Sequence, residues 1–232
     1  MLTAALLVGV AVLTFLTVEI GPLYAADRSR ERRDPSDAER RRLDALRERA
    51  GLDVDRVAIA RRDDADRERE DTSVEDVGRI EVAVRGPPRR RVLFLSPAVL
   101  DDLDEETALG LLAAEAGRVE TYYGEFRALA VAAVVGVLAA IVTATVPFDA
   151  GFASLVAVGL AAFWAGRRVQ YAADARAGDA VGADLVADAF ERAAAARGVE
   201  PATGDWSTWF EVQPPLGDRI AALRARSESA GE

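Results

Sequence analysis

Three ionisable side chains could do chemistry in this chain, and they occur in two separate segments. Glu115 and Arg118 lie three positions apart in an alanine-rich stretch, and Asp174 follows much later. Two carboxylates such as Glu115 and Asp174 can act as general acid and base, or bind an oxygen-preferring metal. An active hydrolase with an atypical carboxylate site is therefore one possible function.

Composition excludes most other chemistry. The 232 residues include no histidine and no cysteine, and all 29 basic residues are arginine, against 39 acidic residues. Zinc sites built from histidine or cysteine, serine–histidine and cysteine nucleophiles, and lysine Schiff bases are excluded. The net charge of −10 argues against a nucleic-acid partner, because binding phosphates requires a basic surface. An acidic, lysine-free composition also suits a high-salt cytoplasm.

Three apolar runs separate the polar segments. The first, residues 2–26, is long enough to cross a bilayer, and because it lacks a basic N-terminal region it indicates an uncleaved anchor rather than a signal peptide. The second, 128–148, has no charged residue. The third, 151–166, follows so closely that we expect Asp149 and Gly151 to form the turn of an antiparallel helical hairpin.

Arginines flank all three runs on the same side, and this pattern predicts an orientation. They are Arg28, Arg30, Arg32, Arg33, Arg127, Arg167 and Arg168. We expect the N-terminus outside the cell membrane and the polar parts in the cytoplasm. The predicted divisions are an anchor (1–26), a cytoplasmic domain (27–126), a transmembrane hairpin (127–169) and a C-terminal cytoplasmic segment (170–232).

The polar parts are predicted to be α+β. Ser36 and Glu39 form a capping box for a helix that Gly51 ends, because a serine hydroxyl and a glutamate three residues later satisfy free amides of the first turn. The alternating residues 79–95 predict a β-hairpin, and Asp104 caps a helix that leads toward the second apolar run. A short strand is expected at 57–60 and an acidic loop at 62–77.

Three sequence blocks occur in an informative order. Residues 92–118 end in Ala114-Glu115-Ala116-Gly117-Arg118, residues 167–174 run from Arg167 through Gln170 to Asp174, and residues 212–223 contain Gln213-Pro214-Pro215 and Arg219. In this order, split by a hydrophobic hairpin, the blocks resemble the HtpX/CAAX-prenyl-protease family of integral-membrane zinc proteases, which are gluzincin-type enzymes. The resemblance covers roughly residues 79–224.

The resemblance implies a degenerate metal site. Ala114 and Arg118 stand where the family's H-E-x-x-H motif has its two histidines, and Gln170 stands where the family has a ligand glutamate. Alanine has no donor atom, arginine is a permanent cation, and glutamine is a weak neutral donor. We therefore expect the family zinc to be lost, no other cofactor to replace it, and Glu115 to be a relic general base that is inactive.

Three further positions match the framework of the family's site rather than its ligands. Asp174 matches an aspartate that orients a zinc-bound histidine, Gln213 replaces the histidine of a closing H-P-P motif, and Arg219 matches the arginine after that motif. We expect the guanidinium of Arg118 to take the place of the zinc charge by pairing with Glu115 or Asp174. The alternative is that Arg118 points to solvent and pairs with Glu115 or Glu125 on the helix surface.

The sequence therefore predicts a mainly α membrane protein with three transmembrane helices and a metalloprotease-like cytoplasmic α+β domain carrying a small β-hairpin. The function expected is that of a catalytically inactive homologue, a pseudoprotease, that binds or regulates a membrane client or an active protease partner. The partners expected are the lipid bilayer and that protein, with no nucleic acid. Two alternatives are an active membrane peptidase with a carboxylate site, and a structural or signalling membrane anchor.

Overall fold

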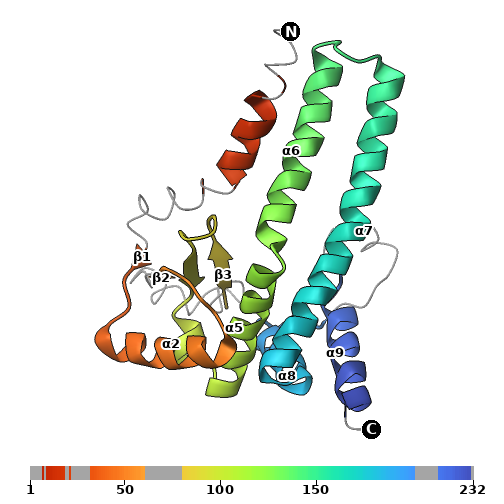
Figure 1. Ribbon diagram of the computed structural model, residues 1–232. Coiled ribbons are helices and arrows are strands. Elements are labelled where there is room, and N and C mark those ends of the chain that lie inside the picture. Colours follow the sequence, from red (N-terminus) through yellow and green to blue (C-terminus); the bar gives the residue numbers. More distant parts are fainter. Residues whose placement is uncertain are drawn as a thin grey trace.

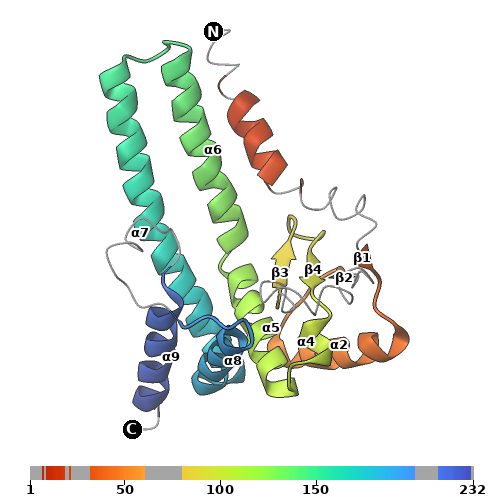
Figure 2. The same ribbon diagram turned by 180° about the vertical axis from the view of Figure 1, so that it is seen from behind.

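The computed structural model describes residues 7, 9–18, 21, 32–60, 80–201 and 214–230. Two long antiparallel helices, α6 (Tyr123–Val142) and α7 (Phe148–Val181), extend from an end that holds a small sheet and the shorter helices (Figure 1, Figure 2). An N-terminal helix, Gly9–Val18, lies beside α6 in both views. The expected loop at 62–77 and Gln213 lie outside the described residues.

The hairpin and the strand expected at 57–60 are both present, and they belong to one four-stranded sheet, which the sequence did not predict. β3 (Val82–Arg85) and β4 (Val92–Leu95) form the expected antiparallel hairpin. β2 (Arg56–Ala60) pairs in parallel with β4, and β1 (Arg32–Arg33) pairs with β2, which gives the order β1-β2-β4-β3. An isolated hairpin is marginally stable, and pairing with β2 covers the second edge of β4.

Helix α2 (Asp37–Ala50) begins and ends as its sequence predicts. The Ser36 hydroxyl accepts from the Glu39 amide at 3.4 Å, and the Ser36 amide donates to the Glu39 carboxylate at 2.7 Å. Gly51 ends the helix at φ 67°, a left-handed conformation that favours glycine. The capping box and the glycine C-cap are both confirmed.

Helix α5 (Glu105–Glu120) is the centre of the compact end. The Asp104 carboxylate accepts a hydrogen bond from the Thr107 amide at 2.8 Å, so the predicted cap is confirmed. Every residue from Thr107 to Gly117 is buried, because α5 contacts β3, α2, α7 and α8. The remaining helices are α4 (Ala98–Asp101), α8 (Ala183–Ala196) and α9 (Leu216–Ala230).

Gly117 brings α5 into backbone contact with α7. A Cβ atom added at this position would lie 2.1 Å from the carbonyl oxygen of Ala173, far inside van der Waals contact. Only a residue without a side chain therefore allows the two helices to approach this closely. The contact places Glu115 and Arg118 on α5 at the level of Gln170 and Asp174 on α7.

The α6–α7 hairpin is present, but its turn is not where the sequence predicted it. α6 ends at Val142, Ala144 has a positive φ of 51°, and α7 begins at Phe148 after Pro147. Asp149 and Gly151 lie in the first turns of α7, so their assignment to the turn was wrong. Pro147 favours a helix start because its φ is fixed and the first helical amides need no partner.

Gly151 has a packing role instead. A Cβ atom there would lie 2.4 Å from Cγ1 of Ile141 on α6, so glycine allows the two helices to pack closely near the turn. Helix α7 then continues without a break to Val181 and crosses the boundary expected between residues 169 and 170. The C-terminal polar segment therefore begins inside a helix.

The surface of the hairpin is apolar and exposed. In the most apolar window of α6 only 11% of residues are buried, and in that of α7 only 6%. Large side chains such as Leu129 and Trp164 are 63% and 67% exposed. Helices of this length with outward-facing apolar side chains are typical of membrane proteins rather than of a soluble core. The hairpin therefore indicates association with a membrane.

Candidate functional site

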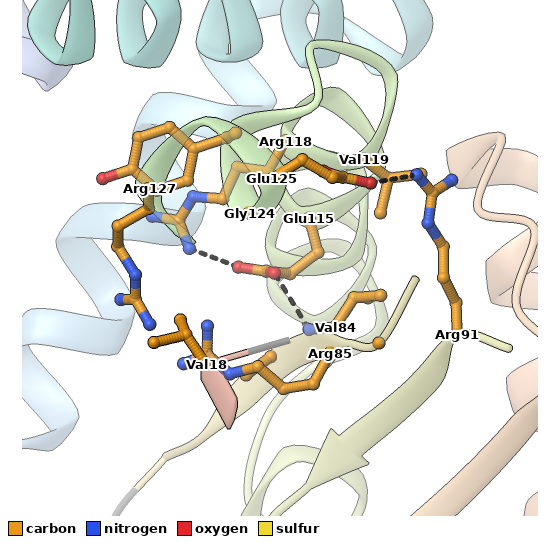
Figure 3. A pocket seen from close by; sticks show the side chains of 13 residues that line it. Val18, Val84, Arg85, Arg91, Glu115, Arg118, Val119, Gly124, Glu125 and Arg127 are labelled. Carbon is orange, nitrogen blue, oxygen red and sulfur yellow. Dashed lines mark hydrogen bonds and ion pairs between the residues drawn. The ribbon is translucent and has the colours of Figure 1, made fainter. Parts of the chain in front are cut away.

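Glu115 is buried between its own helix and the edge of the sheet. It is 6% exposed, and its Oε2 accepts a hydrogen bond from the backbone amide of Val84 in β3 at 3.1 Å. Its Oε1 forms an ion pair with Nη1 of Arg118, one helical turn later (Figure 3). Both carboxylate oxygens of Glu115 are therefore bound to donors of the protein.

The pairing with Glu115 favours the charged form of Arg118. The negative charge of Glu115 raises the pKa of the Arg118 guanidinium, burial acts in the opposite direction, and Asp174 adds to the increase. Arg118 therefore remains a cation inside the site. Of the partners that the sequence suggested for Arg118, Glu115 forms the ion pair in the structure, whereas Glu125 pairs with Arg91 at 3.0 Å.

A second buried ion pair joins Asp174 on α7 to Arg219 on α9. Oδ2 of Asp174 accepts from Nε of Arg219 and Oδ1 accepts from Nη2, both at 2.7 Å. The two side chains are only 3% and 7% exposed. Bidentate geometry of this kind is the strongest that an arginine and a carboxylate form. Asp174 therefore forms its ion pair with Arg219 of α9, whereas Arg118 pairs with Glu115.

Gln170 and Phe190 complete the surroundings of this pair. Nε2 of Gln170 donates to Oδ1 of Asp174 at 3.1 Å, and Gln170 is completely buried. The guanidinium of Arg219 lies over the ring of Phe190 in α8, 4.4 Å from its centroid. The role of Phe190 was not predicted, because nothing in its local sequence marks a residue that contacts an arginine 29 positions later.

The ion pairs contribute to one cavity of about 430 Å³. It lies between the edge strand β3, helices α5 and α8, and the start of α9. Ala114, Glu115, Arg118 and Arg219 line it, together with Val82, Phe190 and Pro214–Leu216. Gln170 and Asp174 do not line the cavity but lie behind it, attached through Arg219. The structure thus groups the candidate residues that it describes, with two ion pairs in place of exposed ligands.

The side chains present do not fit a zinc ion. Ala114 offers no donor atom, Arg118 carries a permanent positive charge, and the Gln170 amide nitrogen donates to Asp174. Over the described ranges, no group of three or more acidic, histidine or cysteine residues is close enough to hold a metal ion. We derive no catalytic step through a metal from these residues.

The described residues form a mainly α fold with a four-stranded sheet and two long apolar helices. Among solved structures, the chain is similar to the crystal structure of S. mikatae Ste24p, with a TM-score of 0.65 and 16% sequence identity. The similarity covers 95% of this chain and 58% of the Ste24p chain, so the protein spans little more than half of that length. No family model and no curated protein matches the sequence.

The similarity shows the fold alone, because the two sequences are only 16% identical.

Proposed function

We propose that this protein is a catalytically inactive relative of the HtpX/CAAX-prenyl-protease membrane metalloproteases, and that it binds a membrane client or an active protease partner. The observation that carries the proposal is the state of Glu115, whose two carboxylate oxygens are bound by Arg118 and by the Val84 amide. These two bonds hold the carboxylate in place, and none of the residues expected at the ligand positions beside it presents a zinc-bound water for it to deprotonate.

Loss of the family zinc is part of the same proposal. The cation at Arg118 supplies positive charge beside Glu115, as a metal would, but it cannot polarise a substrate carbonyl by coordination or generate a metal-bound hydroxide. The chain thereby keeps a buried glutamate in the site without a metal. Ste24p is a membrane zinc metalloprotease, and its fold is the scaffold on which this replacement would have occurred.

The cavity beside these ion pairs supports binding of a partner. It is about 430 Å³ and is lined by the apolar side chains of Val82, Phe190 and Leu216 together with the charged pairs. Such a mixture of apolar walls and a few fixed polar groups is typical of ligand-binding cavities. A side chain of a client segment that reaches the polar end from the membrane would fill it.

The topology proposed is a three-span protein of the cell membrane, with the N-terminus outside and the polar domain in the cytoplasm. Gly9–Val18 lies beside α6, which supports a first span packed on the hairpin. Arg127 lies near the start of α6, and Arg167 lies beyond the apolar part of α7, so both are at the end of the hairpin that joins the compact domain. Arginines concentrate on the cytoplasmic side of membranes.

Peptidase assays test the loss of catalysis. Purified full-length protein is incubated with casein and with a fluorogenic peptide, with and without zinc, beside the Glu115→Gln variant. We expect no cleavage above the Glu115→Gln background in either condition. Cleavage that requires Glu115 would show an active peptidase with an atypical carboxylate site and would end the proposal.

Rebuilding the ligands tests the metal positions. The variant Ala114→His/Arg118→His/Gln170→Glu restores the family's three ligands, and Arg118→His alone is the control. We expect the triple variant to bind one zinc ion per chain after extensive washing, and the wild type and the control to bind none. Stoichiometric zinc in the washed wild type would contradict the proposed loss.

Cross-linking tests the partner. Val199 is 58% exposed at the rim of the cavity, so Val199→Arg obstructs the opening without changing the core. Ala195→Arg introduces the same charge four residues earlier, at an exposed position of α8 that does not line the cavity. We expect Val199→Arg, and not Ala195→Arg, to abolish the cross-link between this protein and its partner protein. Loss of the cross-link only on deletion of 62–77 would favour the structural or signalling anchor.

A further inference from the structure

A second, smaller cavity lies on the other side of the Glu115–Arg118 pair. It has a volume of about 100 Å³ and is bounded by β3 and its turn, by the beginning of α6, and by Val18 at the end of the N-terminal apolar helix. Figure 3 shows Val18, Arg85 and Arg127 around it. The cavity therefore lies at the junction between the apolar hairpin and the polar end.

The cavity contains more positive than negative charge. Four arginines line it, but its only two carboxylates are both engaged: Glu115 pairs with Arg118, and Glu125 pairs with Arg91. Arg85 and Arg127 have no ion-pair or hydrogen-bonding partner within the described part of the chain. Among the described residues, two guanidinium groups without an ion-pair partner thus face one small space, in a chain of net charge −10.

The two unpaired cations affect each other. Arg85 is half-buried, and burial and the positive charges of Arg127 and Arg118 lower the pKa of its guanidinium, whereas Glu115 and Glu81 act in the opposite direction. An anion placed between Arg85 and Arg127 would remove this repulsion. Without one, the arrangement costs free energy, because like charges close together in a partly buried site destabilise each other.

A buried hydroxyl adds a further donor. Tyr123 is only 6% exposed, and among the described residues its hydroxyl oxygen has no hydrogen-bonding partner although it is completely buried. Nε of Arg118 is likewise buried and without a partner. Both residues line this cavity. Buried donors without acceptors are rare in folded proteins, so their concentration here indicates that the cavity receives an acceptor.

We propose that this cavity binds a phosphate group carried by an anionic phospholipid of the membrane. Guanidinium groups and hydroxyls are the side chains that bind phosphate oxygens best. A space of about 100 Å³ admits a phosphate but little more of a headgroup. Basic pockets beside transmembrane helices at the membrane surface bind anionic headgroups in the same way. The site requires only membrane association and does not depend on whether the protein is catalytically inactive.

Lipid binding to the full-length protein in neutral detergent tests the proposal. Native mass spectrometry and thermal unfolding are recorded with phosphatidic acid, with phosphatidylcholine and with inorganic phosphate. We expect one bound phosphatidic acid per chain and a raised Tm, with no such effect of phosphatidylcholine. An equal rise in Tm from inorganic phosphate alone would contradict a lipid source.

Paired variants distinguish lipid binding in the cavity from attraction by general surface charge. Arg85→Gln/Arg127→Gln removes the two unpaired cations, whereas Arg89→Gln/Arg90→Gln removes two exposed cations from the neighbouring β3–β4 turn. We expect the first pair to weaken phosphatidic acid binding about tenfold or more, as for lost charge-assisted hydrogen bonds, and the second pair to leave it unchanged. Equal effects of the two pairs would overturn the proposal.

Two milder variants keep the proposal testable if the Arg85→Gln/Arg127→Gln protein does not fold. Tyr123→Phe removes one donor and keeps the shape, so we expect about fivefold weaker binding, which is the effect of one hydrogen bond. Arg85→Lys/Arg127→Lys keeps both charges and is expected to retain most of the binding. Full binding by Tyr123→Phe together with loss of binding by the lysine variant would not be compatible with a phosphate seated among these donors.

Discussion

Replacing Arg219 with methionine removes the cation that neutralises the buried carboxylate of Asp174. In the native protein this carboxylate accepts two hydrogen bonds from Arg219 and one from Gln170, and only the last remains in Arg219→Met. The carboxylate stays buried, because the Asp174 side chain is 3% exposed. Breaking one partner of a buried ion pair costs about 3–5 kcal/mol, since the other charge is left uncompensated.

The contact between Arg219 and the ring of Phe190 contributes in the same direction. A cation–π contact contributes about 0.5–2 kcal/mol, and the flexible methionine side chain retains part of the apolar packing. Because the packing that methionine retains offsets the lost cation–π contact, we expect the free energy of unfolding to fall by about 3–5 kcal/mol in total. For a chain of this size, about 2–4 °C per kcal/mol corresponds to a decrease in Tm of about 6–20 °C.

Thermal unfolding of the full-length protein in detergent, followed by circular dichroism, measures this decrease. The control is Arg226→Met on the same helix, which breaks the Arg226–Asp179 pair of 2.7 Å. Its side chains are 48% and 58% exposed, and exposed pairs contribute only about 0–1 kcal/mol. A second change, Asp174→Asn, is expected to restore much of the stability of Arg219→Met.

A Tm for Arg219→Met no lower than that of Arg226→Met would refute this reasoning. It would mean either that water reaches Asp174 or that another cation takes the place of Arg219. Failure of Asp174→Asn to improve the Arg219→Met protein would show that the loss comes from packing and not from an uncompensated charge.

Three further predictions concern packing, pH and topology. Gly117→Ala introduces a Cβ 2.1 Å from a carbonyl oxygen of α7 and is expected to destabilise the protein by about 1–3 kcal/mol, measured by thermal unfolding. The control Gly124→Ala, with no atom within 4 Å, should be nearly neutral. The hydrogen bonds from Arg33 lower the pKa of Glu39 to about 2 from 4.5. The stability that Glu39 contributes is therefore present above pH 4.5 and lost as the pH falls toward 2, so the Tm difference between wild type and Glu39→Gln should shrink over this range. Because the chain has no cysteine, a cysteine introduced in place of Asp149 or Ser229 is its single site for maleimide labelling. In intact cells, a membrane-impermeant maleimide should label the variant at position 149 and not the variant at position 229.

Each of these predictions has a contrary outcome. Equal stability of Gly117→Ala and Gly124→Ala would mean that α5 and α7 are not in backbone contact. A Tm difference for Glu39→Gln that is constant from pH 5 to pH 2 would mean that the Arg33 hydrogen bonds do not shift the pKa of Glu39. Labelling of position 229 in intact cells, with position 149 protected, would reverse the proposed orientation.

Some parts of the structure could be predicted because their causes are local in the sequence. The caps at Ser36, Asp104 and Gly51 satisfy backbone groups of the adjoining helical turn, so a few neighbouring residues determine them. The long apolar helices follow from composition alone, and the β3–β4 hairpin follows from alternation around a Gly-Pro-Pro turn. The association of Glu115 with Arg118 also follows from their spacing of three residues on one helix.

The hairpin turn was placed wrongly because two local signals competed. Asp149 and Gly151 have the composition of a turn, but the chain turns before Pro147. Gly151 is instead required for contact with Ile141, a residue of the facing helix. A glycine that allows helix packing cannot be distinguished by sequence from a glycine that allows a turn.

The sequence by itself determined the caps, the apolar helices and the absence of histidine and cysteine, because each depends on residue type or on neighbours within a turn. Only the tertiary structure decided that Arg219, 45 positions away, neutralises Asp174, and that Arg85 and Arg127 face one cavity. Such pairings depend on how closely the helices pack, as at Gly117, and on which side chains burial brings together. Contacts of this kind have no signature in the order of residues along the chain.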